Sequence, residues 1–349
     1  MASSIRKRYG LAWPAHREHI ADKDISDFAM TTQSTTLPRG SGILLDIKDI
    51  HGRFFYPTKD KRFGHVVSAA TNAFFELPRY ARQLGHELFF GIPVLHDRMM
   101  AATPLGMINA KGEPEGTFVC PSNPAVQDLL IDLLGELNTL APEVNLFLPF
   151  FRYPVKRRLT GGPERVHSIT EDEALCFCQH CQRGFKAAYG ALPKWRIISS
   201  EPRAFYDWLE WRCHTIESLA RKLLQSLSKE KLVFEMDLCP KRFYLDGLFI
   251  NNGHDISTLS KLFKKVMIHV FDRSTPIPPR APTHHIENDI MYMTIERVRR
   301  HATVYLMLWN IATDRDLQVA FDYASSVDVE IRFFVLYPNM VPGLVGRCP

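Results

Sequence analysis

Seven short apolar segments alternate with segments of helical periodicity along most of the chain, and this alternation limits the folds open to it. The apolar segments are hydrophobic throughout rather than at every second residue, which is typical of parallel strands covered on both faces. An eighth strand is expected at 7–12 or at 63–68. The seven predicted strands are 42–48, 87–95, 144–151, 231–237, 266–271, 303–309 and 329–336.

Between these strands the spacing of apolar residues predicts helices. The clearest is 123–137, where Asn123 can accept a hydrogen bond at the N-cap and Pro124 suits the first turn. Residues 99–118 show neither period and are expected to form a long loop. The predicted helices are 69–84, 123–137, 182–190, 202–228, 256–263, 287–300 and 314–324.

Strand–helix units of this number and length favour an α/β fold of one kind, the (β/α)8 TIM barrel, over a doubly wound sheet. No glycine-rich phosphate fingerprint follows any strand, which weakens the doubly wound alternative. The chain has 349 residues and 46% hydrophobic content, enough for a large core. We therefore expect one barrel domain over 41–349, preceded by a short N-terminal extension, 1–40, that packs on it.

Charge and hydropathy exclude some classes of protein. The net charge is +5, and the Lys and Arg residues are spread along the chain, so a nucleic-acid partner is not expected. No stretch of about 18 apolar residues predicts a membrane span. The basic N-terminus lacks the apolar region of a secretion signal, so we expect a cytoplasmic protein. The oligomeric state cannot be predicted from the sequence.

Three of the 7 cysteines lie within six residues, at Cys176, Cys178 and Cys181. This spacing can wrap three thiolates around one tetrahedral ion, and Zn²⁺ is the usual occupant of thiolate-rich sites. A fourth ligand could be His180, inside the stretch, or Cys120, 56 residues upstream. The alternative is a group of buried or redox-active thiols without a metal. Clustered thiols and an odd cysteine count fit a reducing compartment better than a disulfide framework.

Polar and aromatic residues follow the predicted strands at their carboxyl ends, where a TIM barrel carries its active site. Carboxylates can hold sugar hydroxyls and act as acid, base or nucleophile, while aromatic faces stack on pyranose rings. The set therefore indicates a carbohydrate site. Its members are Asp46, Lys48, His96, Asp97, Arg152, Tyr153, Glu235, Asp237, Asp272, Arg273, Trp309 and Tyr337.

Glycoside hydrolysis needs two carboxyl groups that flank one bond. We predict Glu235 as one catalytic carboxylate, with Asp272 or Asp237 as its partner. The remaining candidates would hold the sugar: Asp46, Lys48, Asp97, Arg152, Tyr153, Trp309 and Tyr337. Strands also end in charged residues simply because loops meet water, and Asp46 and Lys48 could instead form a structural ion pair.

Several motifs together resemble a family of glycoside-hydrolase-like TIM barrels and, more remotely, the barrel β-galactosidases that carry a four-cysteine zinc site. They are the first-strand segment 44–57, the segment 92–98, the segment 120–124, the Phe-Arg-Tyr-Pro element at 151–154 and the cysteine turn at 176–181. The resemblance covers most of residues 40–340. It implies a barrel fold, glycosidase activity and a zinc site formed by Cys120, Cys176, Cys178 and Cys181. Four thiolates leave no open position for water, so this zinc would be structural.

The chain departs from the family at one position. Relatives usually carry an Asp three residues before the Arg of that element, and here the residue is Pro149. This removes a carboxylate from the expected site, so three hypotheses remain. The first is an enzyme that hydrolyses a glycoside, an oligosaccharide or a polysaccharide. The second is a non-catalytic relative that binds a glycan or a protein with the same pocket. The third is a metalloprotein whose thiolates sense redox state.

Overall fold

Eight parallel strands carry the fold in a computed structural model, which describes residues 8–13, 42–59, 62, 71–154, 169–238, 249, 252–270, 293–308 and 332–336. The strands are hydrogen-bonded in the order β1–β10–β9–β8–β7–β6–β3–β2, and β1 pairs with both β10 and β2, so the sheet closes into a barrel. Their bounds are β1 (Arg8–Trp13), β2 (Gly42–Asp46), β3 (Glu87–Gly91), β6 (Asn145–Leu148), β7 (Leu232–Leu238), β8 (Lys265–Val270), β9 (Thr303–Leu308) and β10 (Arg332–Leu336).

β1 fills the first of the two positions expected for the eighth strand. Its backbone is in register with β2 from Gly10 to Trp13 and with β10 from Arg8 to Ala12. The strand lies within 1–40, the segment predicted to be an extension, so this part of the segment belongs to the sheet itself. The rest of 1–40 lies outside the described residues, and the division at residue 40 stays a prediction.

Helices follow several of the strands, as expected for an α/β fold. The longer ones are α2 (Thr71–Leu84), α4 (Pro124–Leu140), α5 (Gln179–Tyr189), α7 (Pro202–Ser226) and α8 (Ile256–Leu262), with short α3 (Arg98–Ala101) and α6 (Trp195–Ile198). Residues 293–299 are also helical. The helix predicted at 314–324 lies outside the described residues, so a helix after every strand is not shown. None of the helices in the described segments is both long and apolar enough to cross a bilayer.

The start of α4 illustrates how local sequence sets an element. The Asn123 side chain accepts a hydrogen bond from the backbone N of Ala125 at 3.0 Å, and Pro124 occupies the first turn. This is the cap that the sequence predicts. The helix then carries buried leucines on one face, which fixes its orientation against the sheet.

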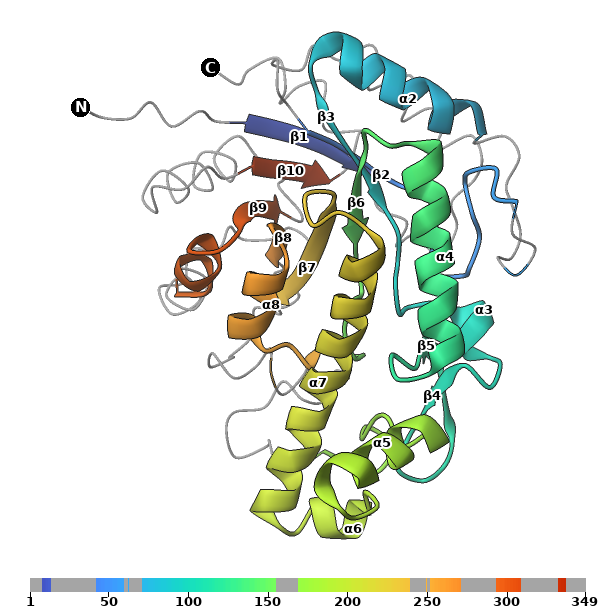
Figure 1. Ribbon diagram of the computed structural model, residues 1–349, viewed down its shortest axis with the longest axis vertical. Helices are drawn as coiled ribbons and strands as arrows, with labels where there is room; N and C mark the ends of the chain where they lie inside the picture. The colour runs from blue at the N-terminus through green and yellow to red at the C-terminus, as the bar shows by residue number, and fades with distance from the viewer. Residues whose placement is uncertain are drawn as a thin grey trace, which may run out of the picture.

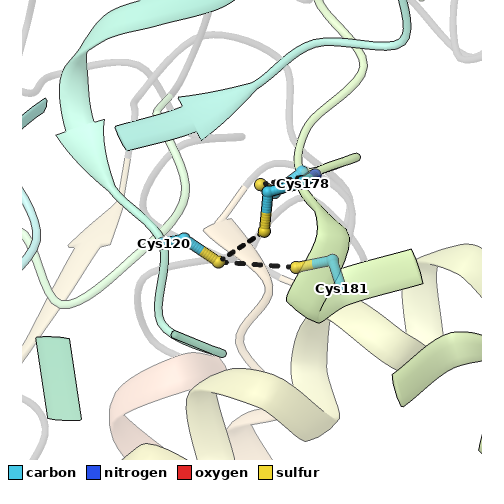
Figure 2. A group of neighbouring side chains, drawn as sticks. Cys120, Cys178 and Cys181 are labelled. Atoms are coloured by element: carbon cyan, nitrogen blue, oxygen red, sulfur yellow. Dashed lines mark hydrogen bonds between the residues drawn. The ribbon is translucent and has the colours of Figure 1, made fainter. Parts of the chain in front are cut away.

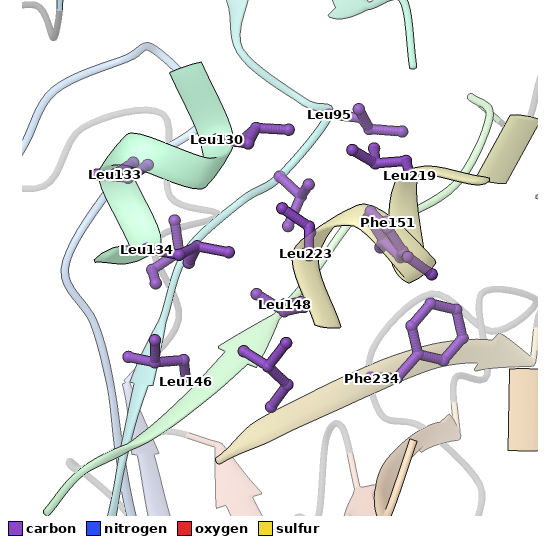
Figure 3. Packing of buried hydrophobic residues seen from close by; sticks show 14 of the residues in the cluster. Leu95, Leu130, Leu133, Leu134, Leu146, Leu148, Phe151, Leu219, Leu223 and Phe234 are labelled. Atoms are coloured by element: carbon purple, nitrogen blue, oxygen red, sulfur yellow. The ribbon is translucent and has the colours of Figure 1, made fainter. Parts of the chain in front are cut away.

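The core between sheet and helices is made of these leucines and their counterparts. Figure 3 shows Leu134 of α4 near Leu146 and Leu223 of α7 near Leu148, the latter of each pair belonging to β6. In Figure 1 α4 and α7 lie beside each other along the sheet, whereas α5 and α6 gather at the opposite end of the molecule from α2. The interior of the barrel holds a second, separate apolar cluster: Leu44, Phe89, Phe147, Val233, Met267, Tyr305 and Met307.

The prediction of a loop over 99–118 is wrong. This segment contains α3 and an antiparallel hairpin, β4 (Gly106–Ile108) with β5 (Pro114–Val119). The Asn109 side chain builds the turn, because its Oδ1 accepts hydrogen bonds from the backbone N of Lys111 and of Glu113, at 3.0 and 2.9 Å. Gly112 completes the turn at a φ of 88°. β4 has only three residues, and β5 (Pro-Glu-Gly-Thr-Phe-Val) is apolar only in its last two, so no hydrophobic pattern marks these strands and the turn chemistry was the only signal.

The third predicted strand is shorter than expected. The sequence predicts 144–151, but β6 ends at Leu148, directly before Pro149. Proline has no N–H and cannot continue the ladder on that side. The chain therefore leaves the sheet at Pro149, and the next residues form the rim of the barrel near β7.

Candidate functional site at the carboxyl ends of the strands

Two carboxylates, those of Asp46 and Glu235, lie next to the apolar cluster inside the barrel, on its C-terminal side. Side chains two residues apart on a strand share a face. Asp46 follows Leu44 on β2 and Glu235 follows Val233 on β7, and both Leu44 and Val233 belong to the interior cluster. Asp46 is 3% exposed and Glu235 is 2% exposed. The structure thus places two buried acids at the end of the barrel where TIM barrels carry their active sites.

Glu235 is held by the backbone of the neighbouring rim. Its Oε2 accepts a hydrogen bond from the backbone N of Phe150. Phe150 has a φ of 58°, a left-handed conformation that residues other than glycine rarely adopt. Such outliers gather at functional sites, where the surrounding structure forces them. The end of β6 therefore contributes a main-chain donor rather than a side-chain acid.

The carboxylate of Asp46 lies against Gly91, a residue without a side chain. Asp46 and Gly91 are partners in the register of β2 and β3. A Cβ added to Gly91 would lie 1.6 Å from Asp46 Oδ1, so only glycine leaves room for this carboxylate. The sequence predicted Asp46 as a sugar-binding residue, and its position inside the barrel is compatible with this.

Lys48 and Asp97, two other predicted sugar-binding residues, form a buried ion pair. Lys48 Nζ lies 2.8 Å from Asp97 Oδ2, and each side chain is 1% exposed. Lys48 also donates to the carbonyl oxygen of Pro93 at 3.2 Å, and Asp97 accepts from the backbone N of Met100 at 2.8 Å, as the N-cap of α3. These contacts give both residues a structural role. The ion pair considered for Lys48 forms, but with Asp97 in place of Asp46.

Arg152 lies between aromatic rings at the rim. Its Cζ is 5.3 Å from the ring centre of Phe150 and 6.0 Å from that of Phe118, and its Nη1 donates to the carbonyl oxygen of Tyr153 at 3.2 Å. The side chain is 4% exposed. The guanidinium therefore packs the rim as a cation over aromatic faces.

Tyr153 is part of the wall between β6 and α7. Its ring is fully buried, its hydroxyl pairs with Thr215 Oγ1 at 2.8 Å, and Arg212 Cζ lies 4.4 Å from the ring centre. Burial raises the pKa of Tyr153 well above its ordinary value, with a further contribution from the nearby cysteine charges. This position gives Tyr153 a packing role beside the cysteine cluster.

The structure adds His96 to the rim. Its ring stacks on Phe118 with centroids 4.6 Å apart and meets Phe150 edge-on at 4.8 Å. His96 is half-buried, and it follows the second predicted strand in the sequence. It was recognised there as a strand-end residue but received no role. The packing partners come from β5 and the end of β6, which sequence spacing could not place beside it.

The structure does not describe the side chains of five residues of the predicted carbohydrate site. Asp272, Arg273, Trp309 and Tyr337 lie outside the described residues. Asp237 lies on β7, two residues after Glu235, and only its backbone is described. The predicted pairing of Glu235 with Asp272 or Asp237 thus stays a prediction.

The four cysteines of the expected metal site meet in space. The sulfur atoms of Cys120, Cys176, Cys178 and Cys181 lie within 4.8 Å of one another, and all four residues are buried. Figure 2 shows Cys120 directly after β5 approaching Cys178 and Cys181 at the start of α5. Cys120 Sγ is 3.4 Å from the sulfur of Cys178 and 3.5 Å from that of Cys181. His180 does not belong to this group.

The separations suit a tetrahedral ion. Zinc–sulfur bonds of about 2.3 Å in a tetrahedron place the sulfurs about 3.8 Å apart, between the shortest separations here and the 4.8 Å limit. Two backbone N–H groups point at Cys176 Sγ, those of Ile108 and of Cys178, each at 3.5 Å. Such donors stabilise thiolates. Four buried thiols in this arrangement can hold a metal ion.

The thiols also affect one another's protonation. Hydrogen bonds from Cys120, Cys176 and Cys181 lower the pKa of Cys178. Hydrogen bonding with Cys176, Cys178 and Cys181, together with burial, raises the pKa of Cys120. The thiolate of Cys178 is therefore stabilised by hydrogen bonds from the neighbouring thiols. If the other thiols also lost their protons, the thiolates would repel one another, and a bound cation would compensate this repulsion.

Comparisons with known proteins agree with the barrel. No protein-family model matches the chain, and no curated protein matches it in sequence. The fold is similar to that of the β-amylase catalytic domain from Paenibacillus polymyxa, at a TM-score of 0.60 and 10% identity, over 97% of this chain and 94% of that one. It is also similar to a β-galactosidase from the psychrophilic Marinomonas ef1, at 0.62 and 9%, over 94% of this chain and 53% of that one.

A third similar structure is a GH20 exo-β-N-acetylglucosaminidase from Vibrio harveyi, an inactive mutant. Its TM-score is 0.51 and its identity 12%, over 95% of this chain and 50% of that one. The chain thus spans about half the length of the β-galactosidase and of this enzyme. At such identities the similarity shows the fold, and the remote resemblance to a glycoside-hydrolase-like barrel holds at that level.

Proposed function

We propose that this protein is a carbohydrate-active enzyme that hydrolyses a glycosidic bond, with Glu235 as one of its catalytic carboxylates. The observation that carries the proposal is the environment of Glu235. It is buried next to the apolar barrel interior, in the middle of β7 and one residue beyond the pairing of Phe234 with the last residue of β6, and one of its oxygens accepts the backbone N–H of Phe150. A carboxyl group fixed at the catalytic end of a barrel is what glycoside hydrolysis requires of each of its two acids.

The partner carboxylate in this proposal is Asp272 or Asp237. Asp46 is a further candidate, because it also faces the barrel interior and is 3% exposed. Retaining enzymes hold their carboxyl groups about 5–5.5 Å apart and inverting enzymes roughly 6.5–9.5 Å apart. The partner, once identified by mutation, would thus also determine the stereochemical outcome. Trp309 and Tyr337 would supply aromatic faces for the sugar.

The similar structures support the substrate class. They are named β-amylase, β-galactosidase and exo-β-N-acetylglucosaminidase, and all three of these names denote enzymes that act on glycosides. We propose an oligosaccharide, a polysaccharide or a glycoside as substrate. We also propose that the scaffold is a full (β/α)8 repeat and that the protein is located in the cytoplasm.

We also propose Zn²⁺ as the ion of the four-cysteine site, with Cys120, Cys176, Cys178 and Cys181 as ligands. Zinc would supply structure and no chemistry, since four thiolates leave no coordination position for water. The cysteines would join the end of β5 to the start of α5, two segments 56 residues apart. A redox-sensing thiol cluster is the competing interpretation of the same residues.

A binding protein without catalytic activity is the second candidate function. Its support is Pro149, which ends β6 and brings no acid to the rim where the resembling family carries Asp. Under this hypothesis the same strand-end residues would hold a glycan, and Glu235 would accept hydrogen bonds from its hydroxyls without transferring a proton.

Glu235→Gln separates the two functions. The amide keeps the shape of the side chain but cannot act as acid, base or nucleophile. Wild type and variant are assayed on a panel of aryl glycosides and polysaccharides, and glycan binding is measured in parallel by calorimetry. For the enzyme we expect kcat to fall on the order of 10²–10⁴-fold with a small change in KM.

Glu87→Gln is the matched control, because Glu87 begins β3 at the opposite, N-terminal end of the barrel. It should retain kcat within a few-fold. If wild type cleaves no member of the panel yet binds a glycan, and Glu235→Gln binds it less tightly, the protein is a binding module and the hydrolase proposal is wrong.

A further inference from the structure

The backbone at Phe150 is the least expected feature of the rim. Its φ of 58° is the single left-handed value among the residues other than glycine in the described segments. A side chain at such a φ crowds the adjacent carbonyl oxygen, so the conformation is unfavourable unless its surroundings impose it. The N–H of the same residue donates to Glu235 Oε2. The unusual turn and the carboxylate contact thus occur at one residue.

The residues on either side hold this turn in place. Pro149 precedes it with a fixed φ and no N–H, and its carbonyl oxygen accepts from the backbone N of Val94 at 2.9 Å. Phe151 follows it, with its ring packed on Phe234 at 5.4 Å and its carbonyl oxygen 2.9 Å from His254 Nε2. The peptide of Phe150 therefore has little freedom to rotate.

The ring of Phe150 is held as well. It meets His96 edge-on at 4.8 Å, and the guanidinium of Arg152 lies 5.3 Å from its centre. These contacts lie on the rim beside β5 and β6, while the N–H points across to β7. The packing of the Phe150 ring against His96 and Arg152 thus helps to hold the Phe150 N–H in its direction toward Glu235.

We infer that Phe150 is a positioning residue for Glu235. The turn at Phe150 holds the Pro149–Phe150 peptide with its N–H directed at Oε2, and this contact restrains the carboxyl group and the direction in which it meets a ligand. The catalytic meaning of this contact rests on the proposed function, whereas the contact itself does not. A main-chain donor is suited to the task, because its position does not depend on a flexible side chain.

The contact can be tested without a substrate. The 23 phenylalanines are labelled with ¹⁵N in the full-length protein, and the Phe150 amide is identified as the signal missing from Phe150→Gly. We expect the Phe150 amide proton to resonate far downfield and to respond to pH as Glu235 titrates. Glu235→Gln should shift it upfield and abolish the pH response, whereas Glu87→Gln should leave it unchanged.

Kinetics test the positioning role. With any glycoside that the wild type cleaves, Phe150→Gly should lower kcat by roughly tenfold to a hundredfold with KM little changed, because a small misplacement of a reacting group has effects of this size. Phe150→Tyr, which keeps the ring contacts, should restore most of the loss. A merely structural role predicts instead that activity follows the folded fraction and that the pH–rate profile stays in place.

The outcomes distinguish this inference from the proposed function. A downfield Phe150 amide that depends on Glu235, in a protein that cleaves no glycoside, supports the positioning and contradicts the hydrolase. An amide insensitive both to pH and to Glu235→Gln overturns the positioning, whatever the activity.

Discussion

Lys48 Nζ and Asp97 Oδ2, two residues expected to hold a sugar, lie 2.8 Å apart with only 1% of each side chain exposed. Lys48 comes two residues after β2 and Asp97 is the N-cap of α3, so the pair joins the segments that follow the neighbouring strands β2 and β3. A charge buried this deeply is tolerated when its partner is present, and removal of one partner leaves the other unpaired.

Lys48→Met should therefore destabilise the protein by about 3–5 kcal/mol, the range measured when one member of a buried pair is removed. Urea denaturation at pH 7 provides the free energy of unfolding. Arg62→Met is the matched control, because the Arg62–Asp132 pair is 52% exposed on both sides and its loss should matter by no more than about 1 kcal/mol. If Lys48→Met instead keeps its stability and loses glycan binding, Lys48 is a ligand-binding residue as the sequence suggested.

The different outcomes for Lys48 and Glu235 show what the sequence could predict. Both were recognised because they follow apolar runs, and a parallel barrel brings such strand ends to one edge. Alternation then places Glu235 inside the barrel, two residues after Val233. Lys48 lies beyond the end of β2, where alternation no longer determines the direction of a side chain, so its pairing with Asp97 could not be predicted.

The seven predicted strands were recognisable because their hydrophobic runs, although short, are continuous, whereas β1 has no such run and could only be named as one of two positions. The hairpin at β4 and β5 was missed because its order arises from the Asn109 side chain and not from a hydrophobic period. The donor at Phe150 was missed for a related reason. Pro149 could be interpreted only as the loss of a carboxylate, since a sequence does not show that the next backbone N–H turns toward Glu235.

The four-cysteine site makes removal of metal testable. If zinc joins Cys120 to the turn at 176–181, then purified protein should contain about one equivalent, and a strong chelator should lower Tm. Cys181→Ala should lose the metal and lower Tm by roughly 5 °C or more, at about 2–4 °C per kcal/mol. Elemental analysis and calorimetry measure the two effects.

Cys213→Ala is the control for that experiment. Cys213 is also buried, on α7, but stands outside the four-sulfur group, and burial raises its pKa to about 12. Its replacement should leave the metal content unchanged. A wild type with less than about half an equivalent of zinc and four titratable thiols would support the thiol-only interpretation.

The packing of α4 against the sheet should depend on single leucines. Leu134 is fully buried and faces Leu146 of β6 in Figure 3. Leu134→Ala removes three carbons from this contact and should destabilise the protein by about 2–5 kcal/mol. Leu84, at the end of α2, is 43% exposed, and the same substitution there should cost much less. Equal losses in a denaturant titration would mean that α4 is not packed as described.

His86, directly before β3, should make stability depend on pH. It is 9% exposed, neither ring nitrogen has a hydrogen-bond partner among the described residues, and burial lowers its pKa below 6.5. Below pH 6.5 the unfolded chain binds a proton that the folded chain refuses, so the unfolded state gains stability. The contribution of His86 to folding is therefore complete above pH 6.5 and is lost as pH falls toward the folded pKa.

The free energy of unfolding, measured in urea from pH 5 to 7.5, should fall less steeply with acid in His86→Phe than in wild type. His301→Phe, at an exposed position, is the control and should keep the wild-type slope. Parallel curves for wild type and His86→Phe would show that His86 accepts its proton as readily in the folded protein as in the unfolded chain.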